Sequence, residues 1–124
     1  MTTTTPQLDE FTNAYLECAL WSTNDESTPS GGCPLDDNYS IEDIDPEMIA
    51  TAVADCERFQ RDHAALLEGQ DLSRAGHDFW LTRNGHGAGF WDGDWGDLGD
   101  ALDEACEPYK EINLCVENGT VYQL

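Results

Sequence analysis

The sequence predicts an α+β domain in which two N-terminal helices precede a β-hairpin, a third helix and a second β-hairpin. Helical apolar spacing recurs in residues 8–22, 46–68 and 97–109. Short apolar runs flank the Asn-Gly pairs at residues 84–85 and 118–119, and Asn-Gly favours tight hairpin turns. We therefore expect the two hairpins to form a mainly antiparallel four-stranded sheet covered by the helices.

The chain length predicts one domain, because 124 residues bury one core but not two. Residues 1–6 are rich in threonine and predict a disordered tail, which leaves residues 7–124 as a single acidic domain. Four Trp, four Tyr and four Phe supply large side chains for its core.

The first predicted helix covers residues 8–22, where Leu8, Phe11, Tyr15 and Cys18 follow a helical spacing. A long segment, residues 23–40, follows with two prolines and two glycines, which exclude extended regular structure. A loop of this length is usually functional or mobile. Its acidic residues, including Asp36 and Asp37, make it a candidate binding loop.

The second predicted helix begins at a clear start signal and runs to about Glu68. Asp45 is placed to act as N-cap, Pro46 as the first helical residue and Glu47 in the first turn. Gly69 is the expected terminator. His63 lies on the apolar stripe of this helix, where we expect a hydrogen-bonded core histidine rather than a ligand.

The third predicted helix follows the aromatic segment that is expected to form the first hairpin, around Phe79, Trp80, Phe90 and Trp91. On this helix apolar residues occupy one side and carboxylates the other, with no Lys or Arg among them. An exposed helix normally mixes charges to gain i,i+4 pairs, although a charged face is often only a solvated face. The acidic face consists of Asp97, Asp100, Asp103, Glu104 and Glu107.

The charge balance is the extreme property of the composition. Twenty-six Asp and Glu against five Lys and Arg give a formal net charge of −21. Residues 1–57 hold 13 acidic residues and no basic one, and residues 84–108 hold seven more, again without a basic residue. Disorder, adaptation to high salt and imitation of nucleic acid are the three interpretations, and the aromatic content argues against the first. Segregation of the charge along the chain favours imitation of nucleic acid.

Several functional classes find little support in the sequence. No signal peptide or transmembrane segment is evident, which predicts a cytoplasmic protein with no membrane partner. The five cysteines lack CxxC spacing and are expected to be reduced. The excess of negative charge disfavours direct binding of nucleic acid. No cofactor or metal is expected, since no EF-hand, P-loop or zinc spacing is complete.

The segment HDFWLTRNGHGAGFWDGD, residues 77–94, resembles a stretch found in small acidic proteins encoded by bacteriophages. This resemblance implies a phage or mobile-element origin and a bacterial cytoplasm, and it carries no catalytic residue. In size and acidity the chain is also similar to DNA-mimic inhibitors, which include antirestriction, anti-CRISPR and uracil-DNA glycosylase inhibitor proteins. That second similarity lies in composition and not in a motif.

The function we expect is therefore non-enzymatic inhibition, in which carboxylates occupy the basic groove of a host DNA-binding protein. The acidic face of residues 97–107 forms one predicted contact strip. Asp36, Asp37, Glu42, Asp43, Asp45 and Glu47 form the second. Trp95 and Trp21 are the predicted exposed anchors among these charges.

The sequence is also compatible with two alternative functions. In the first, the acidity serves solubility and the aromatic hairpin binds a partner. In the second, His77, Asp78 and His86, with Asn84 nearby, form a weak metal-binding enzyme site across the two hairpin strands.

Overall fold

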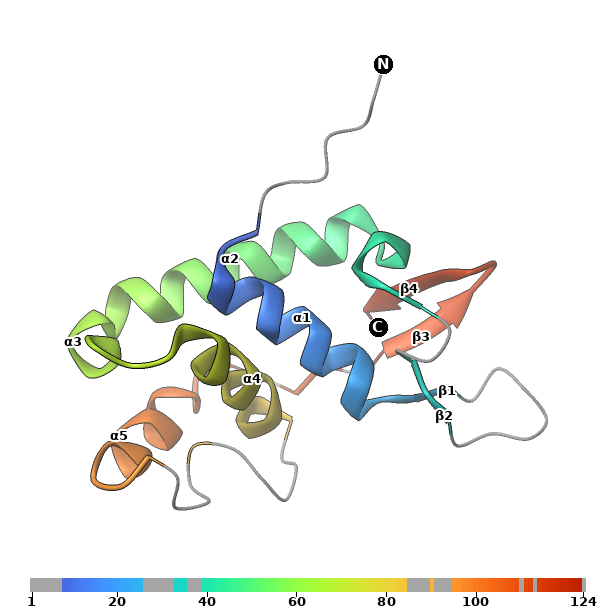
Figure 1. Cartoon of the computed structure of the whole chain (residues 1–124). Helices are drawn as coiled ribbons and strands as arrows, with labels where there is room; N and C mark the ends of the chain where they lie inside the picture. The colour runs from blue at the N-terminus through green and yellow to red at the C-terminus, as the bar shows by residue number, and fades with distance from the viewer. Residues whose placement is uncertain are drawn as a thin grey trace.

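A computed structural model describes residues 8–25, 33–35, 39–84, 90, 95–109, 111–112 and 114–123. In this part of the chain five α-helices and two separate two-stranded sheets form the architecture (Figure 1). In chain order the elements are α1 (Glu10–Ser22), β1 (Asn24–Asp25), β2 (Cys33–Pro34), the short 3-10 helix η2 (Ile41–Asp43), α2 (Pro46–Asp62), α3 (Ala64–Leu67), α4 (Leu72–Arg83), α5 (Leu98–Ala105), β3 (Leu114–Glu117) and β4 (Thr120–Gln123). The domain is mainly helical, so the predicted α+β class with a four-stranded sheet is wrong.

The largest correction concerns the predicted first hairpin, because its first strand is the second half of helix α4. The Oδ1 atom of Asp71 accepts hydrogen bonds from the backbone N–H groups of Ser73 and Arg74, which caps the start of this helix. Its buried residues Ala75, Gly76, Asp78, Phe79, Trp80 and Leu81 include pairs three and four positions apart. Helical capping and spacing therefore prevail over the β propensity of the aromatic run. The predicted turn, residues 85–89, and Trp91 lie outside the described residues.

Helix α4 packs most extensively on α1, and a glycine makes this close approach possible. A Cβ atom added at Gly76 would stand 2.0 Å from the backbone oxygen of Phe11. No side chain fits at that distance, and a backbone carbonyl cannot rotate away as a flexible side chain can. The glycine in the middle of α4 thus lets the two helices come together, despite the helix propensity that it costs.

Aromatic side chains from several elements form the centre of the core. Phe59 of α2 stacks on Phe79 of α4 with ring centroids 4.3 Å apart, and Tyr109 meets Phe79 edge-on at 4.9 Å. On the other side, Tyr15 of α1 meets Trp80 edge-on at 5.3 Å. Offset and edge-to-face contacts of this kind stabilise aromatic pairs beyond their buried area.

The predicted start of the second helix is confirmed, and the first helix begins two residues later than predicted. Helix α1 begins after Asp9, whose Oδ1 atom accepts a hydrogen bond from the N–H of Thr12 at 2.8 Å. Helix α2 begins with Pro46 as its first residue, and Asp45 holds the N-cap position without a side-chain capping bond. The predicted continuous helix to Glu68 is divided at His63 into α2 and α3. Gly69 follows α3 with a φ of +76°, a conformation that glycine adopts without strain.

The predicted C-terminal hairpin is confirmed. Strands β3 and β4 pair antiparallel, and both turn residues, Asn118 and Gly119, have positive φ values of 53° and 79°. Those values are characteristic of a type I′ turn. Val121 of β4 is fully buried, and its carbonyl accepts a hydrogen bond from the N–H of Asp45. The hairpin is thereby attached to the start of α2.

Candidate functional site

Helix α5 and the residues beside it carry the acidic face that the sequence predicts, but the helix ends at Ala105 and not near Tyr109. Asp97 is its N-cap residue, and Glu107 lies in the turn that follows. On the inner side of the helix Leu102 is fully buried, and a Cβ atom at Gly99 would stand 2.5 Å from the carbonyl oxygen of Phe90. The helix is therefore pressed against the core along that side. Of the acidic residues, Asp103 is half-buried and Asp97, Asp100, Glu104 and Glu107 are exposed. No ion pair within the described residues involves these five carboxylates.

The second acidic group lies at the other end of the molecule. Glu42 and Asp43 belong to η2, and Glu47 is in the first turn of α2. The carboxylate of Asp43 makes a hydrogen bond within the domain, because its Oδ2 atom accepts from the N–H of Ser40 at 2.9 Å. Asp36 and Asp37 lie outside the described residues. Figure 1 places the start of α2 beside β4, far from α5, so the structure does not join the two groups into one strip.

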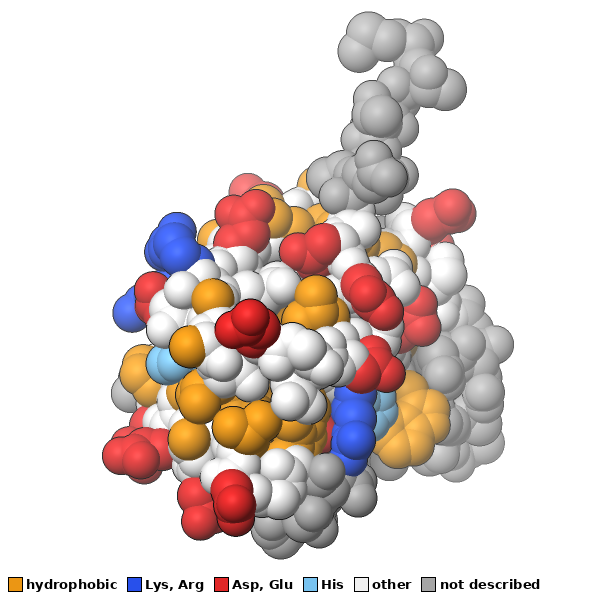
Figure 2. Space-filling view, turned by 60° about the vertical axis from the view of Figure 1, so that its left-hand side comes forward, with side chains coloured by type: hydrophobic (Ala, Val, Ile, Leu, Met, Phe, Trp, Pro, Cys, Tyr) orange, Lys and Arg blue, Asp and Glu red, His pale blue; other side chains and the backbone are white. Residues whose placement is uncertain are grey.

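The arginines of the described residues are engaged in contacts within the molecule. Arg58 and Arg61 each approach Asp62, at 3.7 and 3.8 Å, on the surface of α2. The guanidinium of Arg83 is buried, and its Nη1 atom donates to Asp55 at 3.0 Å and to the hydroxyl of Tyr15 at 2.9 Å. On the face shown in Figure 2, basic side chains gather at two places and acidic side chains are spread around hydrophobic ones.

Trp95 is buried, so the prediction that it forms an exposed anchor is wrong. Its side chain is 7% exposed and meets Phe90 edge-on at 5.3 Å. The indole Nε1 atom donates a hydrogen bond to the Oδ2 atom of Asp78, which is also buried. The partner of Trp95 lies 17 positions earlier in the chain, a tertiary contact that a local sequence pattern does not reveal.

Trp21, the other predicted anchor, is exposed. More than half of its surface, 54%, is accessible at the end of α1. It borders an open pocket of about 560 Å³ between α1 and α4. The pocket is lined by Ala14, Glu17, Cys18, Trp21, Asp71, Ser73, Arg74 and His77. Sequence reasoning missed this pocket, although Glu17 and Trp21 stand four positions apart on α1 and Arg74 and His77 three apart on α4, spacings that place each pair on one helix face.

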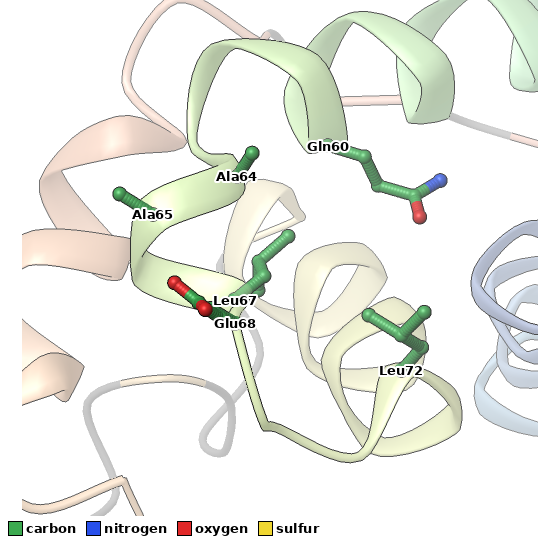
Figure 3. Close-up of a pocket in the computed structure, with 6 residues that line it drawn as sticks. All are labelled: Gln60, Ala64, Ala65, Leu67, Glu68 and Leu72. Atoms are coloured by element: carbon green, nitrogen blue, oxygen red, sulfur yellow. The ribbon is translucent and has the colours of Figure 1, made fainter.

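A second hollow of about 430 Å³ lies at the junction of α2, α3 and α4 (Figure 3). Leu67 and Leu72 point toward it, and Gln60 reaches it from α2, whereas Glu68 points away. The remaining lining residues are Ala64 and Ala65. The lining is mostly apolar, and its polar groups are too few to resemble a catalytic arrangement.

The described residues of the predicted enzyme site make hydrogen bonds to other parts of the domain. The Nδ1 atom of His77 lies 3.4 Å from Asp78, but that carboxylate also accepts the bond from Trp95. The amide of Asn84 donates to the carbonyl of Trp80 and accepts from the N–H of Ile112, which ties the end of α4 to the C-terminal segment. His86 lies outside the described residues. In the part of the chain that the structure describes, no three His, Cys, Asp or Glu side chains gather as metal ligands.

The aromatic hairpin predicted as a partner-binding surface is not formed by the residues the structure describes. Phe79 and Trp80 belong to α4, and both are buried together with Phe90. Large aromatic side chains at these positions contribute to the core and offer no contact surface.

The cysteine thiols of the core are poor nucleophiles. Burial raises the pKa of Cys18 and of Cys106 to about 12, with a further rise from nearby Asp78 and Asp103 respectively. Burial likewise raises the pKa of Cys56 far above its ordinary value. Because the thiolate is the reactive form, these residues do not support nucleophilic catalysis near neutral pH.

Comparison of the chain with protein-family models, with curated proteins and with solved structures finds no match in any of the three. Among the described residues no helix has both the length and the apolar character needed to cross a bilayer.

Proposed function

We propose that this protein binds the DNA-binding surface of a partner protein by presenting carboxylates where DNA presents phosphates. The observation that carries the proposal is the outer face of α5, where Asp97, Asp100 and Glu104 are exposed and have no ion-pair partner among the described residues. Carboxylates without an ion-pair partner among the described residues are available to cations on another molecule.

The linear charge density of this face is similar to that of a nucleic-acid strand. At about 1.5 Å of rise per residue, the three exposed carboxylates and the half-buried Asp103 between them span roughly 10 Å along the helix axis. That corresponds to about one charge per 3.5 Å, against one phosphate per about 3.4 Å along one DNA strand. A basic groove that neutralises closely spaced phosphates would therefore meet a comparable row of charges.

The net charge of −21 supports the same function at longer range. Charge of this magnitude draws a basic surface toward the protein and makes association fast and dependent on ionic strength. The acidic group at Glu42, Asp43, Asp45 and Glu47 supplies a second, separate contact region. A partner that touches both ends would have to extend across the molecule.

The partner class follows from the resemblances in the sequence. A phage or mobile-element protein in a bacterial cytoplasm would act on a host DNA-binding enzyme of restriction, of CRISPR immunity or of DNA repair. Phosphate imitation conveys no base sequence, because sequence is read from base edges. Different enzymes with basic grooves are therefore equally compatible with the acidic surface, and experiment must identify the target.

Affinity capture from bacterial lysate tests the proposal. The tagged protein is incubated at low salt, washed, and eluted first with duplex DNA and then with high salt. We expect DNA-binding enzymes in the DNA eluate, because duplex and acidic surface compete for one groove. If proteins without DNA-binding function appear, and only in the salt eluate, the proposal is wrong.

A matched pair of variants locates the contact. The first carries Asp100→Asn, Asp103→Asn and Glu104→Gln in α5. The second removes the same number of charges elsewhere, through Glu57→Gln, Glu68→Gln and Glu117→Gln, all at exposed positions. We expect the α5 variant to lose about tenfold in affinity and the second variant far less, because close charge pairs at an interface contribute more than distant ones. Equal losses would show that only net charge matters.

A further inference from the structure

We propose that the pocket between α1 and α4 binds the guanidinium group of an arginine side chain, with Trp21 as the aromatic surface on which it lies. The site itself is argued from its own residues. Only the assignment of this arginine to a DNA-binding partner rests on the proposed function.

Trp21 supplies the first element of such a site. Its indole is 54% exposed, and one side is supported by the ring of His77 at a centroid distance of 5.7 Å. A supported and accessible indole is the best side chain for cation–π contact, and arginine is its most frequent partner. Burial of such a large ring against a partner is also typical of residues that dominate binding energy.

Two carboxylates at the pocket are held in place by bonds to one of their oxygen atoms. The amide of Asn13 donates to the Oε1 atom of Glu17 at 2.6 Å. The N–H groups of Ser73 and Arg74 donate to the Oδ1 atom of Asp71. The second oxygen of each carboxylate has no hydrogen-bond donor among the described residues. Fixed carboxylates lose little side-chain entropy on binding, which favours recognition of a cation.

The charge around the pocket is negative despite one basic residue. Arg74 also lines it, and its guanidinium carbon stands 5.1 Å from the ring centroid of Trp95. Glu17 and Asp71 line the pocket as well. Glu10 lies next to it, and its Oε1 atom accepts a hydrogen bond from the hydroxyl of Ser73 at 2.8 Å. Three carboxylates against one guanidinium leave an excess of negative charge that suits a cationic guest.

Arginine fits these features better than lysine. A guanidinium is planar, so it can stack on the indole of Trp21 while its edge donates to Glu17 or Asp71. It is also more weakly hydrated than an ammonium group, which lowers the cost of leaving water. A DNA-binding groove commonly carries arginines for phosphate contacts, so the proposed partner would present the required group.

Titration of the isotopically labelled protein with short peptides tests the site directly. The probes are acetyl-GRGRG-amide, acetyl-GKGKG-amide and acetyl-GQGQG-amide, and the readout is the chemical shift of the Trp21 indole N–H at low salt. We expect a saturable shift with the arginine peptide, a weaker one with the lysine peptide and none with the glutamine peptide. Shifts of equal size for arginine and lysine, or shifts spread over the acidic surface that spare Trp21, would overturn the proposal.

Variants that keep the fold separate the contributions of the pocket. The Trp21→Leu variant lacks the indole N–H, so peptide binding is followed through the amide signals of Glu17 and His77. We expect its affinity for the arginine peptide to fall about tenfold. Asp71→Asn retains an N-cap residue and Glu17→Gln retains an acceptor for Asn13, so each removes charge alone and should weaken binding severalfold. Glu57→Gln, on α2, is the control that should bind as the original does. Equal affinity in Trp21→Leu and the original protein would exclude the indole as the platform.

The same variants distinguish failure of this site from failure of the proposed function. If the captured enzyme is displaced by duplex DNA but binds Trp21→Leu normally, the pocket is not the arginine site and DNA mimicry remains supported. If the arginine peptide binds at Trp21 but no captured protein is displaced by DNA, the arginine site is supported and the partner belongs to another class.

Discussion

The indole Nε1 of Trp95 donates a hydrogen bond of 2.5 Å to the Oδ2 atom of Asp78. The bond joins the segment before α5 to the middle of α4, and both residues are 7% exposed. It explains why a carboxylate can be tolerated inside a domain that already carries a large excess of negative charge. It also assigns Trp95 to the core and leaves Trp21 as the accessible indole among the described residues.

Replacement of Trp95 by phenylalanine should destabilise the domain. The substitution keeps an aromatic ring but removes the donor, so Asp78 stays buried without this bond. We expect the free energy of unfolding to fall by about 1 to 3 kcal/mol. Urea denaturation followed by far-UV circular dichroism measures it. Trp21→Phe is the control and should change stability by less than about 0.5 kcal/mol, as exposed positions do. Equal effects of the two substitutions would contradict the assignment of Trp95 to the core.

Added salt should raise the melting temperature, and most of the rise should occur at moderate concentration. The exposed carboxylates repel one another, and screening relieves that repulsion. The screening length falls from about 10 Å at 0.1 M salt to about 3 Å at 1 M, so the effect should be nearly complete below about 0.5 M sodium chloride. Thermal melts at increasing salt provide the measurement. A melting temperature that keeps rising above about 1 M would instead support adaptation to high salt.

The cap of α1 should give a defined pH dependence. Burial raises the pKa of Asp9, but hydrogen bonds from Thr12 and Gln60 outweigh it and hold the pKa below its ordinary value. A carboxyl with a lowered pKa in the folded state stabilises that state above its unfolded pKa of about 3.9. This contribution is lost as pH falls through the lower, folded value.

Asp9→Asn isolates that contribution, because asparagine also caps helices but does not titrate. We expect the original protein to be more stable than the variant at pH 7, and the difference to shrink as the pH falls below about 4. Urea unfolding of both proteins between about pH 2.5 and pH 7 measures the difference. A stability difference independent of pH would show that the charge of Asp9 does not contribute.

The buried thiols should resist modification in the native state. Burial raises the pKa of Cys18 and Cys106 to about 12, so little thiolate forms at pH 8. We expect iodoacetamide to label Cys115, which is partly exposed, well before Cys18, Cys56 or Cys106. Peptide mapping by mass spectrometry before and after unfolding in urea would show this order. Rapid native labelling of Cys56 would contradict its position in the core.

The sequence predicted the elements whose signals are local. Pro46 after Asp45 marks the start of α2, and the Asn118-Gly119 pair specifies the C-terminal turn, because both depend on the φ preferences of single residues. The separation of apolar and acidic residues in α5 was likewise evident from helical periodicity. These features do not require knowledge of a distant partner.

The prediction of a strand in the second half of α4 is wrong because the aromatic run there has high β propensity, and a glycine, Gly76, lies in the middle of the helix. The opposing signals were present: Asp71 is a good N-cap, and Leu72, Ala75, Phe79 and Arg83 share a helical face. The need for Gly76 becomes clear only from the approach of Phe11 on α1. The burial of Trp95 and the pocket beside Trp21 are also tertiary properties, which no local pattern contains.

Competition between this protein and duplex DNA for the captured enzyme tests the central claim most directly. The apparent Kd of the protein for the enzyme is measured at increasing concentrations of duplex. DNA mimicry predicts that the apparent Kd rises in proportion to duplex concentration, because one groove cannot hold both. An apparent Kd that stays constant, with protein and duplex bound to the enzyme together, would contradict the claim that the carboxylates occupy the DNA-binding groove.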